Sequence, residues 1–400
     1  MLQLLWLLLP VAAASGWYAA RRSARRSTKG LDVHYVQGLN YLISEQPDKA
    51  IEVFTRMVEV DSDTVEVHVA LGNLFRRRGE VDRAIRIHQN LIARPSLTRV
   101  QRAMALLELG EDYLRAGLLD RAESLFKELT DAKLHTEAAL RHLVGIYEQE
   151  KEWADAIDAA QRLESVSGKP LGPVIAQYHC ELAEQARRED GLEGALRGIK
   201  RALAHDPGCV RATIMQGHIE MELGRYKAAC QSFMRVPEQD VEYLSEVLTP
   251  LKECFQAQER PDALGDFLRN LLERHPNTAA VVAMADLLEQ QRGTPDAAEF
   301  LAECLNRNPS LLGIQRLVRL YRTRAEGERR SDLRTLGERM ERLFEDVPAY
   351  FCTHCGFNGK ALHWQCPGCG RWSTLKPMRG MSVHAFLATT TTSLKTRQTQ

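Results

Sequence analysis

Four cysteines near the C-terminus have the spacing of a metal site. The stretch FCTHCGFNGKALHWQCPGCGRW, residues 351–372, holds one Cys-x-x-Cys pair at Cys352 and Cys355 and a second, ten residues further on, at Cys366 and Cys369. Such a pair brings two sulfurs close enough to bind one ion, and two facing pairs complete a tetrahedral four-sulfur site. We therefore predict that all four cysteines bind a single ion of iron or zinc, and both metals suit four thiolates.

The surroundings of these cysteines indicate what the ion does. Gly356 and Gly370 each follow the second cysteine of a pair, where a glycine lets the turn adopt positive φ. Four sulfurs leave no open position for a substrate, which argues against hydrolytic catalysis. A segment this short buries too little apolar surface to fold alone, so the metal is expected to hold it together. A redox centre is the alternative.

The composition of the chain favours a folded, mostly helical protein. It has 400 residues, 44% hydrophobic and 26% charged, and its formal net charge is zero, which gives no general argument for nucleic-acid binding. Five further cysteines are scattered without regular spacing, and we interpret them as small buried residues of helices. They are Cys180, Cys209, Cys230, Cys254 and Cys304.

A repeat of 34 residues organises the middle of the chain. Gly38 recurs as Gly72, and Ala50 recurs as Ala84, with an aromatic residue between them in both copies. This period, with small and aromatic residues at these offsets, resembles the tetratricopeptide repeat, a helical hairpin that buries its apolar face only by stacking on neighbours. We predict an all-α superhelix of about eight repeats over residues 31–310, the last two degenerate, followed by a helical connector over residues 311–348 and the metal domain over residues 349–380.

Such an array offers an extended concave surface for peptides or proteins. The sequence contains no phosphate-binding glycine loop, no metalloprotease motif and no hydrolase nucleophile motif, so we expect no enzyme, no catalytic residues and no organic cofactor. The second repeat carries a run of arginines that we interpret as solvated, because Glu80 and Asp82 lie among them. A patch that meets anionic lipid or an acidic partner is the alternative.

The N-terminal residues have the properties of a membrane anchor. Residues 1–20 contain no charged side chain, and about 19 helical residues span roughly 28 Å, close to the thickness of a bilayer core. The basic segment 21–30 follows directly. The positive-inside rule then places the N-terminus outside and everything after Arg21 in the cytoplasm. A cleaved signal peptide is disfavoured because its positive charge would precede the apolar run. Residues 381–400 are Thr-rich, and we expect a disordered tail.

The whole layout resembles the lipopolysaccharide assembly protein B family of Gram-negative bacteria. The resemblance rests on the apolar N-terminus, the string LGNLFRRRGEVDRAIRIHQNL at residues 71–91 and the terminal CPGCGRWSTLKPMRG, and it covers residues 1 to about 380. It implies a rubredoxin-type module whose four ligands match Cys352, Cys355, Cys366 and Cys369 one for one. The tail beyond Gly380 is longer than the family leads us to expect, and no role can be assigned to it.

The resemblance also implies a function and a set of partners. Members of this family are inner-membrane adaptors that help the FtsH protease degrade the deacetylase that commits precursors to lipid A. They thereby limit lipopolysaccharide synthesis, and they respond to an inner-membrane protein that senses lipopolysaccharide. A general scaffold for envelope assembly and a rubredoxin-like electron-transfer protein remain alternatives, and a homodimer remains open. No nucleic-acid partner is expected.

Overall fold

The computed structural model describes residues 33–378, apart from residues 45, 61–64, 276 and 346–347. The predicted anchor over residues 1–20, the basic segment 21–30 and the tail 381–400 lie outside the described residues. Within the described ranges, every helix is too short or too polar to cross a membrane.

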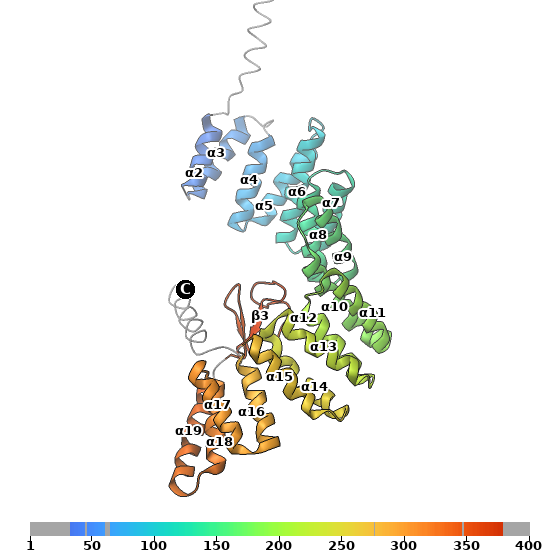
Figure 1. The fold of residues 1–400 in the computed structure, drawn as a ribbon. Helices are drawn as coiled ribbons and strands as arrows, with labels where there is room; N and C mark the ends of the chain where they lie inside the picture. Colours follow the sequence, from blue (N-terminus) through green and yellow to red (C-terminus); the bar gives the residue numbers. More distant parts are fainter. Residues whose placement is uncertain (1–32, 45, 61–64, 276, 346–347, 379–400) are drawn as a thin grey trace, which may run out of the picture. The chain divides into compact units, whose positions relative to one another are not determined.

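The chain forms two compact units, which we describe separately. The first comprises residues 1–151 with 165–168, and its described part is entirely helical (Figure 1). Its helices form consecutive antiparallel pairs, each followed by the next pair along the chain. They are α2 (Val33–Ile43), α3 (Pro47–Val60), α4 (Val65–Arg78), α5 (Val81–Ile92), α6 (Arg99–Arg115), α7 (Leu119–Asp131) and α8 (Thr136–Glu150).

Small residues let the two helices of a pair approach closely. A Cβ atom added to Gly38 would lie 2.5 Å from the ring of Phe54, and one added to Gly110 would lie 2.6 Å from the ring of Phe126. Both phenylalanines are fully buried. Gly38, predicted from the repeat, and Gly110 at the equivalent position of α6 therefore have a packing role, because any side chain there would collide with the ring.

The second unit comprises residues 152–164 with 169–400 and contains most of α9 (Trp153–Ser167). Helical pairs continue through this unit, and within its described residues one 3-10 turn interrupts them. The elements are α10 (Gly172–Glu189), α11 (Gly191–His205), α12 (Val210–Glu222), α13 (Tyr226–Gln239), η2 (Val241–Tyr243), α14 (Leu244–Ala257), α15 (Pro261–Arg274), α16 (Thr278–Arg292), α17 (Thr294–Arg307), α18 (Leu311–Arg324) and α19 (Gly327–Glu345).

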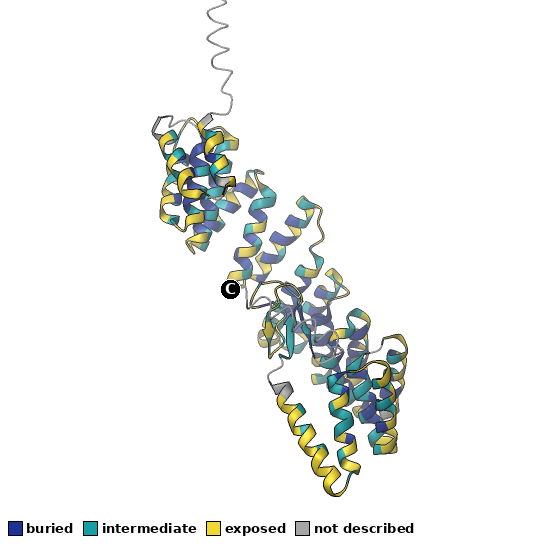
Figure 2. Ribbon diagram, turned by 90° about the vertical axis from the view of Figure 1, so that its left-hand side faces the viewer, coloured by how far each residue is buried: buried dark blue, intermediate teal, exposed yellow. Residues whose placement is uncertain are grey.

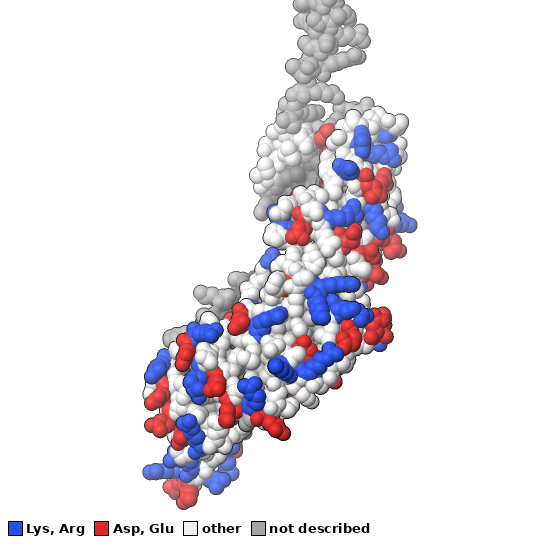
Figure 3. Space-filling view, turned by 45° about the vertical axis from the view of Figure 1, so that its right-hand side comes forward, with Lys and Arg blue, Asp and Glu red and all other residues white. Residues whose placement is uncertain are grey.

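Buried residues gather along the seams between the helices, whereas α19 is exposed along nearly its whole length (Figure 2). Acidic and basic side chains are interspersed over the helices in Figure 3. The all-α fold class with a small C-terminal domain is thus confirmed. The predicted transmembrane helix is not part of that finding, since it lies outside the described residues.

A small antiparallel sheet ends the described chain. Its strands are β1 (Tyr350–Cys352), β2 (Asn358–Gly359) and β3 (Leu375–Pro377), in the order β2-β1-β3. Phe351 pairs with Asn358 on one side and with Lys376 on the other. An isolated bridge between Gln365 and Trp372 closes the second cysteine turn. The sheet therefore places both cysteine pairs at one end of a very small domain.

The arginine run in the second repeat is exposed, as interpreted, at Arg77, Arg78, Arg83 and Arg86, and only Arg76 departs from that interpretation. The side chain of Arg76 is only 12% exposed and is ion-paired to Glu108, Glu111 and Asp112 at 2.6–2.8 Å. These acids belong to α6 of the next repeat, 32 to 36 residues away, so the sequence neighbourhood of Arg76 did not reveal them. Arg83 is exposed and ion-paired to Glu80, as expected for a solvated position.

Candidate metal centre

The structure brings the four predicted ligands together. All four sulfur atoms lie within 4.8 Å of one another. Cys352 Sγ is 3.9 Å from Cys369 Sγ, and Cys355 Sγ is 3.7 Å from Cys366 Sγ. A tetrahedral zinc–sulfur site with bonds near 2.3 Å has edges of about 3.8 Å, so the sulfurs fit one ion. An iron ion with four sulfur ligands fits the same arrangement.

The two turns that carry the sulfurs have the same backbone conformation. Gly356 has a φ of 75° and Gly370 a φ of 69°, the left-handed region that favours glycine. The Gly356 N–H donates to the carbonyl of Cys352 at 3.0 Å, and the Gly370 N–H donates to the carbonyl of Cys366 at 2.8 Å. Each glycine thus closes a tight turn and turns the second sulfur back toward the first.

The environment of the sulfurs favours a bound cation. Burial raises the pKa of Cys352, but hydrogen bonds with Thr374 and with the backbone N–H groups of Cys355 and His354 outweigh it and lower that pKa to about 6. The N–H of Phe357 lowers the pKa of Cys355. Desolvation and hydrogen bonds with the other three sulfurs raise that pKa by more, so the net shift is upward. Thiolates bind a metal cation, so a lowered pKa at Cys352 suits a ligand.

Aromatic side chains fix the metal domain to the helices of its own unit. The ring of Trp372 lies 6.1 Å from that of Trp153 and 6.1 Å from that of Tyr178, edge-on to both. The ring of Trp364 stacks on Tyr243 of η2 at 5.4 Å. Both tryptophans of this module therefore lie against the helices.

Polar contacts surround these aromatic pairs. Gln177 Nε2 donates to Ser373 Oγ at 3.0 Å, and the Tyr350 hydroxyl donates to the carboxylate of Glu246 at 3.1 Å. Lys376 is ion-paired to Asp240. Sequence reasoning missed all the helical partners, because no local pattern marks a residue that will meet a segment more than 100 positions away.

The arrangement has a limited chemical repertoire. Four sulfurs complete the coordination of one ion, which in such a shell serves as a structural link or as a one-electron centre. The buried Cys352 and Cys366 lie in the interior of the domain, whereas Cys355 is exposed. The residues of this chain supply the ligands, the turns that orient them and the contacts that join the domain to the helices.

Comparison with known proteins agrees with this description. Residues 350–377 match a family model described as the rubredoxin metal binding domain, and residues 67–100 and 107–170 match models of the tetratricopeptide repeat. The chain is therefore a tetratricopeptide-repeat protein with a rubredoxin-type metal-binding domain.

Relatives extend the likeness along nearly the whole chain. Lipopolysaccharide assembly protein B of Escherichia coli K12 is 41% identical over 95% of this chain and 99% of its own. The protein of the same name from Haemophilus influenzae is 36% identical over 94% of this chain and 98% of its own. The chain belongs to the lipopolysaccharide assembly protein B family. Among solved structures, the tetratricopeptide-repeat protein YrrB is 16% identical, with 48% of this chain and 95% of that chain covered and a TM-score of 0.33.

Proposed function

We propose that this protein is an inner-membrane adaptor that regulates lipopolysaccharide synthesis by presenting the committed-step lipid A deacetylase to the FtsH protease. The observation that carries the proposal is the end-to-end relationship to proteins named for lipopolysaccharide assembly. The helical repeats supply surfaces for protein binding, as stacked hairpins do in other proteins. The metal ion serves as a clamp, because its four sulfur ligands leave no position for a substrate.

The proposed mechanism is tethering. The uncharged residues 1–20 followed by the basic segment 21–30 support an anchor with the body on the cytoplasmic side. An anchored adaptor that holds a client raises its effective concentration at a membrane protease without new catalytic groups. An inner-membrane protein that senses lipopolysaccharide is the proposed regulator of this step.

The half-life of the deacetylase in cells tests the proposal. In a strain that lacks the chromosomal copy, the wild-type chain should restore rapid turnover, whereas the double variant Cys366→Ser and Cys369→Ser should leave the deacetylase long-lived. Cys304→Ser, at a partly buried thiol in α17, is the matched control and should behave as wild type. Turnover that is equally rapid with the double variant would remove the metal domain from the mechanism.

Electron transfer is a second candidate, because the exposed sulfur of Cys355 would give a partner access to a one-electron centre. It predicts visible absorbance that bleaches on reduction and a loss of function when zinc replaces iron. Full activity of a zinc-loaded protein would eliminate it.

A further inference from the structure

The α14/α15 pair lacks the glycine–phenylalanine packing of the α2/α3, α6/α7 and α12/α13 pairs. In the α12/α13 pair, a Cβ atom added to Gly217 would lie 2.5 Å from the ring of Phe233. Gly38 approaches Phe54 in the same way, and Gly110 approaches Phe126. A small residue of the first helix thus leaves room for a large residue of the second. In these three pairs the phenylalanine ring fills that room completely, since Phe54, Phe126 and Phe233 are fully buried.

In the α14/α15 pair, two large residues occupy these positions. Leu251 stands 34 residues after Gly217, and Phe267 stands 34 residues after Phe233. Leu251 is fully buried, so it takes the space that glycine would leave for the ring. Phe267 is only partly buried as a result. Ala263 is partly buried too, although Ala229 at the equivalent position in α13 is fully buried.

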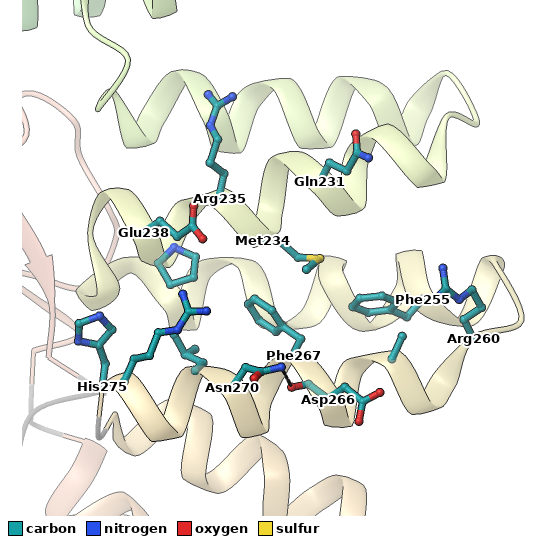
Figure 4. A pocket seen from close by; sticks show the side chains of 14 residues that line it. Gln231, Met234, Arg235, Glu238, Phe255, Arg260, Asp266, Phe267, Asn270 and His275 are labelled. Atoms are coloured by element: carbon teal, nitrogen blue, oxygen red, sulfur yellow. Dashed lines mark hydrogen bonds between the residues drawn. The ribbon is translucent and has the colours of Figure 1, made fainter.

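The displaced ring borders an open groove between α13 and α15 with a volume of about 680 Å³. Met234 of α13, Phe255 of α14 and Phe267 of α15 line it, and Figure 4 shows these three side chains between the helices. In the α2/α3, α6/α7 and α12/α13 pairs a buried phenylalanine fills this apolar seam between the helices. In the α14/α15 pair the seam is accessible to solvent. Exposed apolar seams of this kind mark binding sites.

The rim of the groove is predominantly basic. Arg235, Arg260 and Arg274 are exposed, and no carboxylate is ion-paired to any of them among the residues that the structure describes. Two acids also line the rim, Glu238 and Asp266, but Asp266 is ion-paired to Arg269 at 2.9 Å. Arg235 donates to Thr213 Oγ1 at 3.1 Å, so Arg260 and Arg274 are the arginines available to a ligand. Together with the apolar floor, they favour a ligand with apolar side chains and carboxylates.

We propose that this groove binds an acidic amphipathic segment of a protein partner, whose apolar side chains cover Phe267 and Met234 while its carboxylates pair with Arg260 and Arg274. Helix-in-groove recognition of this type uses apolar anchors three or four residues apart with charges at the edges. Gln231 and Asn270 on the rim suit the amide groups of a peptide. This proposal adds a binding site to the proposed function. It rests on that function in one respect, that the chain binds a protein partner.

Fluorescence anisotropy with a defined probe tests the proposal. The probe is a labelled 18-residue peptide with Leu and Phe at helical spacing and Glu at the flanking positions, and the full chain in detergent is the titrant. We expect binding about tenfold tighter than for a matched peptide with Lys in place of Glu. The double variant Arg260→Glu and Arg274→Glu should weaken binding about tenfold. Arg188→Glu, at an exposed position of α10, is the control and should bind as wild type.

A second variant tests the cause of the groove. Leu251→Gly restores the small residue of the other pairs, so Phe267 should pack inward and peptide binding should fall with the arginines intact. The arginine variants keep the proposal testable if this variant does not fold, because their side chains are exposed. Equal affinity for the Glu and Lys peptides would overturn the proposal, as would unchanged binding by the arginine variant or binding to phosphatidylglycerol vesicles alone.

The two proposals fail separately. Loss of peptide binding in the double arginine variant with normal turnover of the deacetylase would support the groove as a peptide site and place the deacetylase elsewhere. Absence of peptide binding by the wild-type chain overturns the groove proposal and leaves the measurement with Cys366→Ser and Cys369→Ser unaffected.

Discussion

Tyr243 of η2 donates its hydroxyl hydrogen to the backbone carbonyl of Leu375 in β3 at 2.7 Å, across 132 residues of sequence. The tyrosine is 2% exposed, and burial raises its pKa, so the hydroxyl stays protonated and remains a donor at every physiological pH. The ring also stacks on Trp364 at 5.4 Å. A single side chain of the helical repeats thus contacts the metal domain by both its polar and its apolar parts.

The first prediction removes that hydroxyl alone. Tyr243→Phe keeps the stacked ring but leaves the buried carbonyl of Leu375 without this donor, which should lower the free energy of unfolding by about 1–2 kcal/mol. Urea titrations followed by circular dichroism measure the loss. Tyr226→Phe, at a position that is 37% exposed, is the control and should change stability by less than about 0.5 kcal/mol. Equal stability of both variants would show that the hydrogen bond contributes nothing.

The second prediction concerns the metal itself. The purified chain should contain one ion, and a strong chelator should unfold residues 350–378 while the helices persist, because the three short strands bury too little surface to stay folded. Hydrogen exchange with and without chelator would locate the change. Metal affinity should fall as the pH is lowered, since protons compete for the four thiolates. Protection of the strands that survives complete metal removal would contradict the clamp.

The third prediction separates docking from metal binding. Trp372→Ala removes the ring that lies against Trp153 and Tyr178 but leaves all four sulfurs in place. Loss of a packed tryptophan costs about 3 kcal/mol in a protein core. We expect faster hydrogen exchange at the facing residues of α9 and α10 with unchanged metal content. Trp372→Phe should recover most of the protection, and a loss of metal in Trp372→Ala would show that docking and coordination are not separable.

The site and the contacts around it were predictable to different degrees. The spacing of Cys352, Cys355, Cys366 and Cys369 is local, so a short stretch of sequence specifies the cluster. Gly38, which lies against Phe54, follows from the 34-residue period that relates it to Gly72. Gln177 and Tyr243 carry no such mark, because their partners in the metal domain come from a distant segment.

Two further features show where sequence reasoning stopped. The acids that pair with Arg76 stand one repeat later, so a comparison between equivalent positions of adjacent repeats could have found them. Leu251 was visible in the sequence as a large residue where Gly217 and Gly110 stand in other repeats. What the sequence did not reveal is the consequence, a partly exposed Phe267, since that depends on how the two helices adjust to the larger side chain.

The fourth prediction concerns a buried charge network in the first unit. Asp112 is fully buried, accepts from Arg76 at 2.8 Å and lies 2.5 Å from the Nδ1 atom of His88. Asp112→Leu takes a buried carboxylate from both Arg76 and His88, although Arg76 keeps its ion pairs with Glu108 and Glu111. The variant should therefore cost about 2–3 kcal/mol. His88→Phe should cost less than about 1.5 kcal/mol, because Phe54 fills the equivalent position in the preceding pair. Similar losses for both variants, measured by urea unfolding, would contradict this ranking.

The fifth prediction is a loss of stability in acid that depends on His179 of α10. Its side chain is 8% exposed, and its Nδ1 atom has no hydrogen-bond partner among the residues that the structure describes. Burial, with smaller contributions from His205 and Arg201, lowers its pKa to about 4. The unfolded chain, with an ordinary histidine pKa near 6.5, therefore binds more protons between those two values. The stability conferred by the neutral ring is present above pH 6.5 and is lost as the pH falls toward 4.

The comparison with His179→Phe isolates this effect, because phenylalanine preserves the stacking on the His205 ring, whose centroid lies 5.1 Å away, and does not titrate. Between pH 7 and pH 5 the wild type should lose up to about 2 kcal/mol more than the variant. Acid release of the metal affects both proteins equally and cancels in the difference. Urea titrations at several pH values measure it, and parallel pH profiles for the two proteins would show that His179 is already able to take up a proton in the folded state.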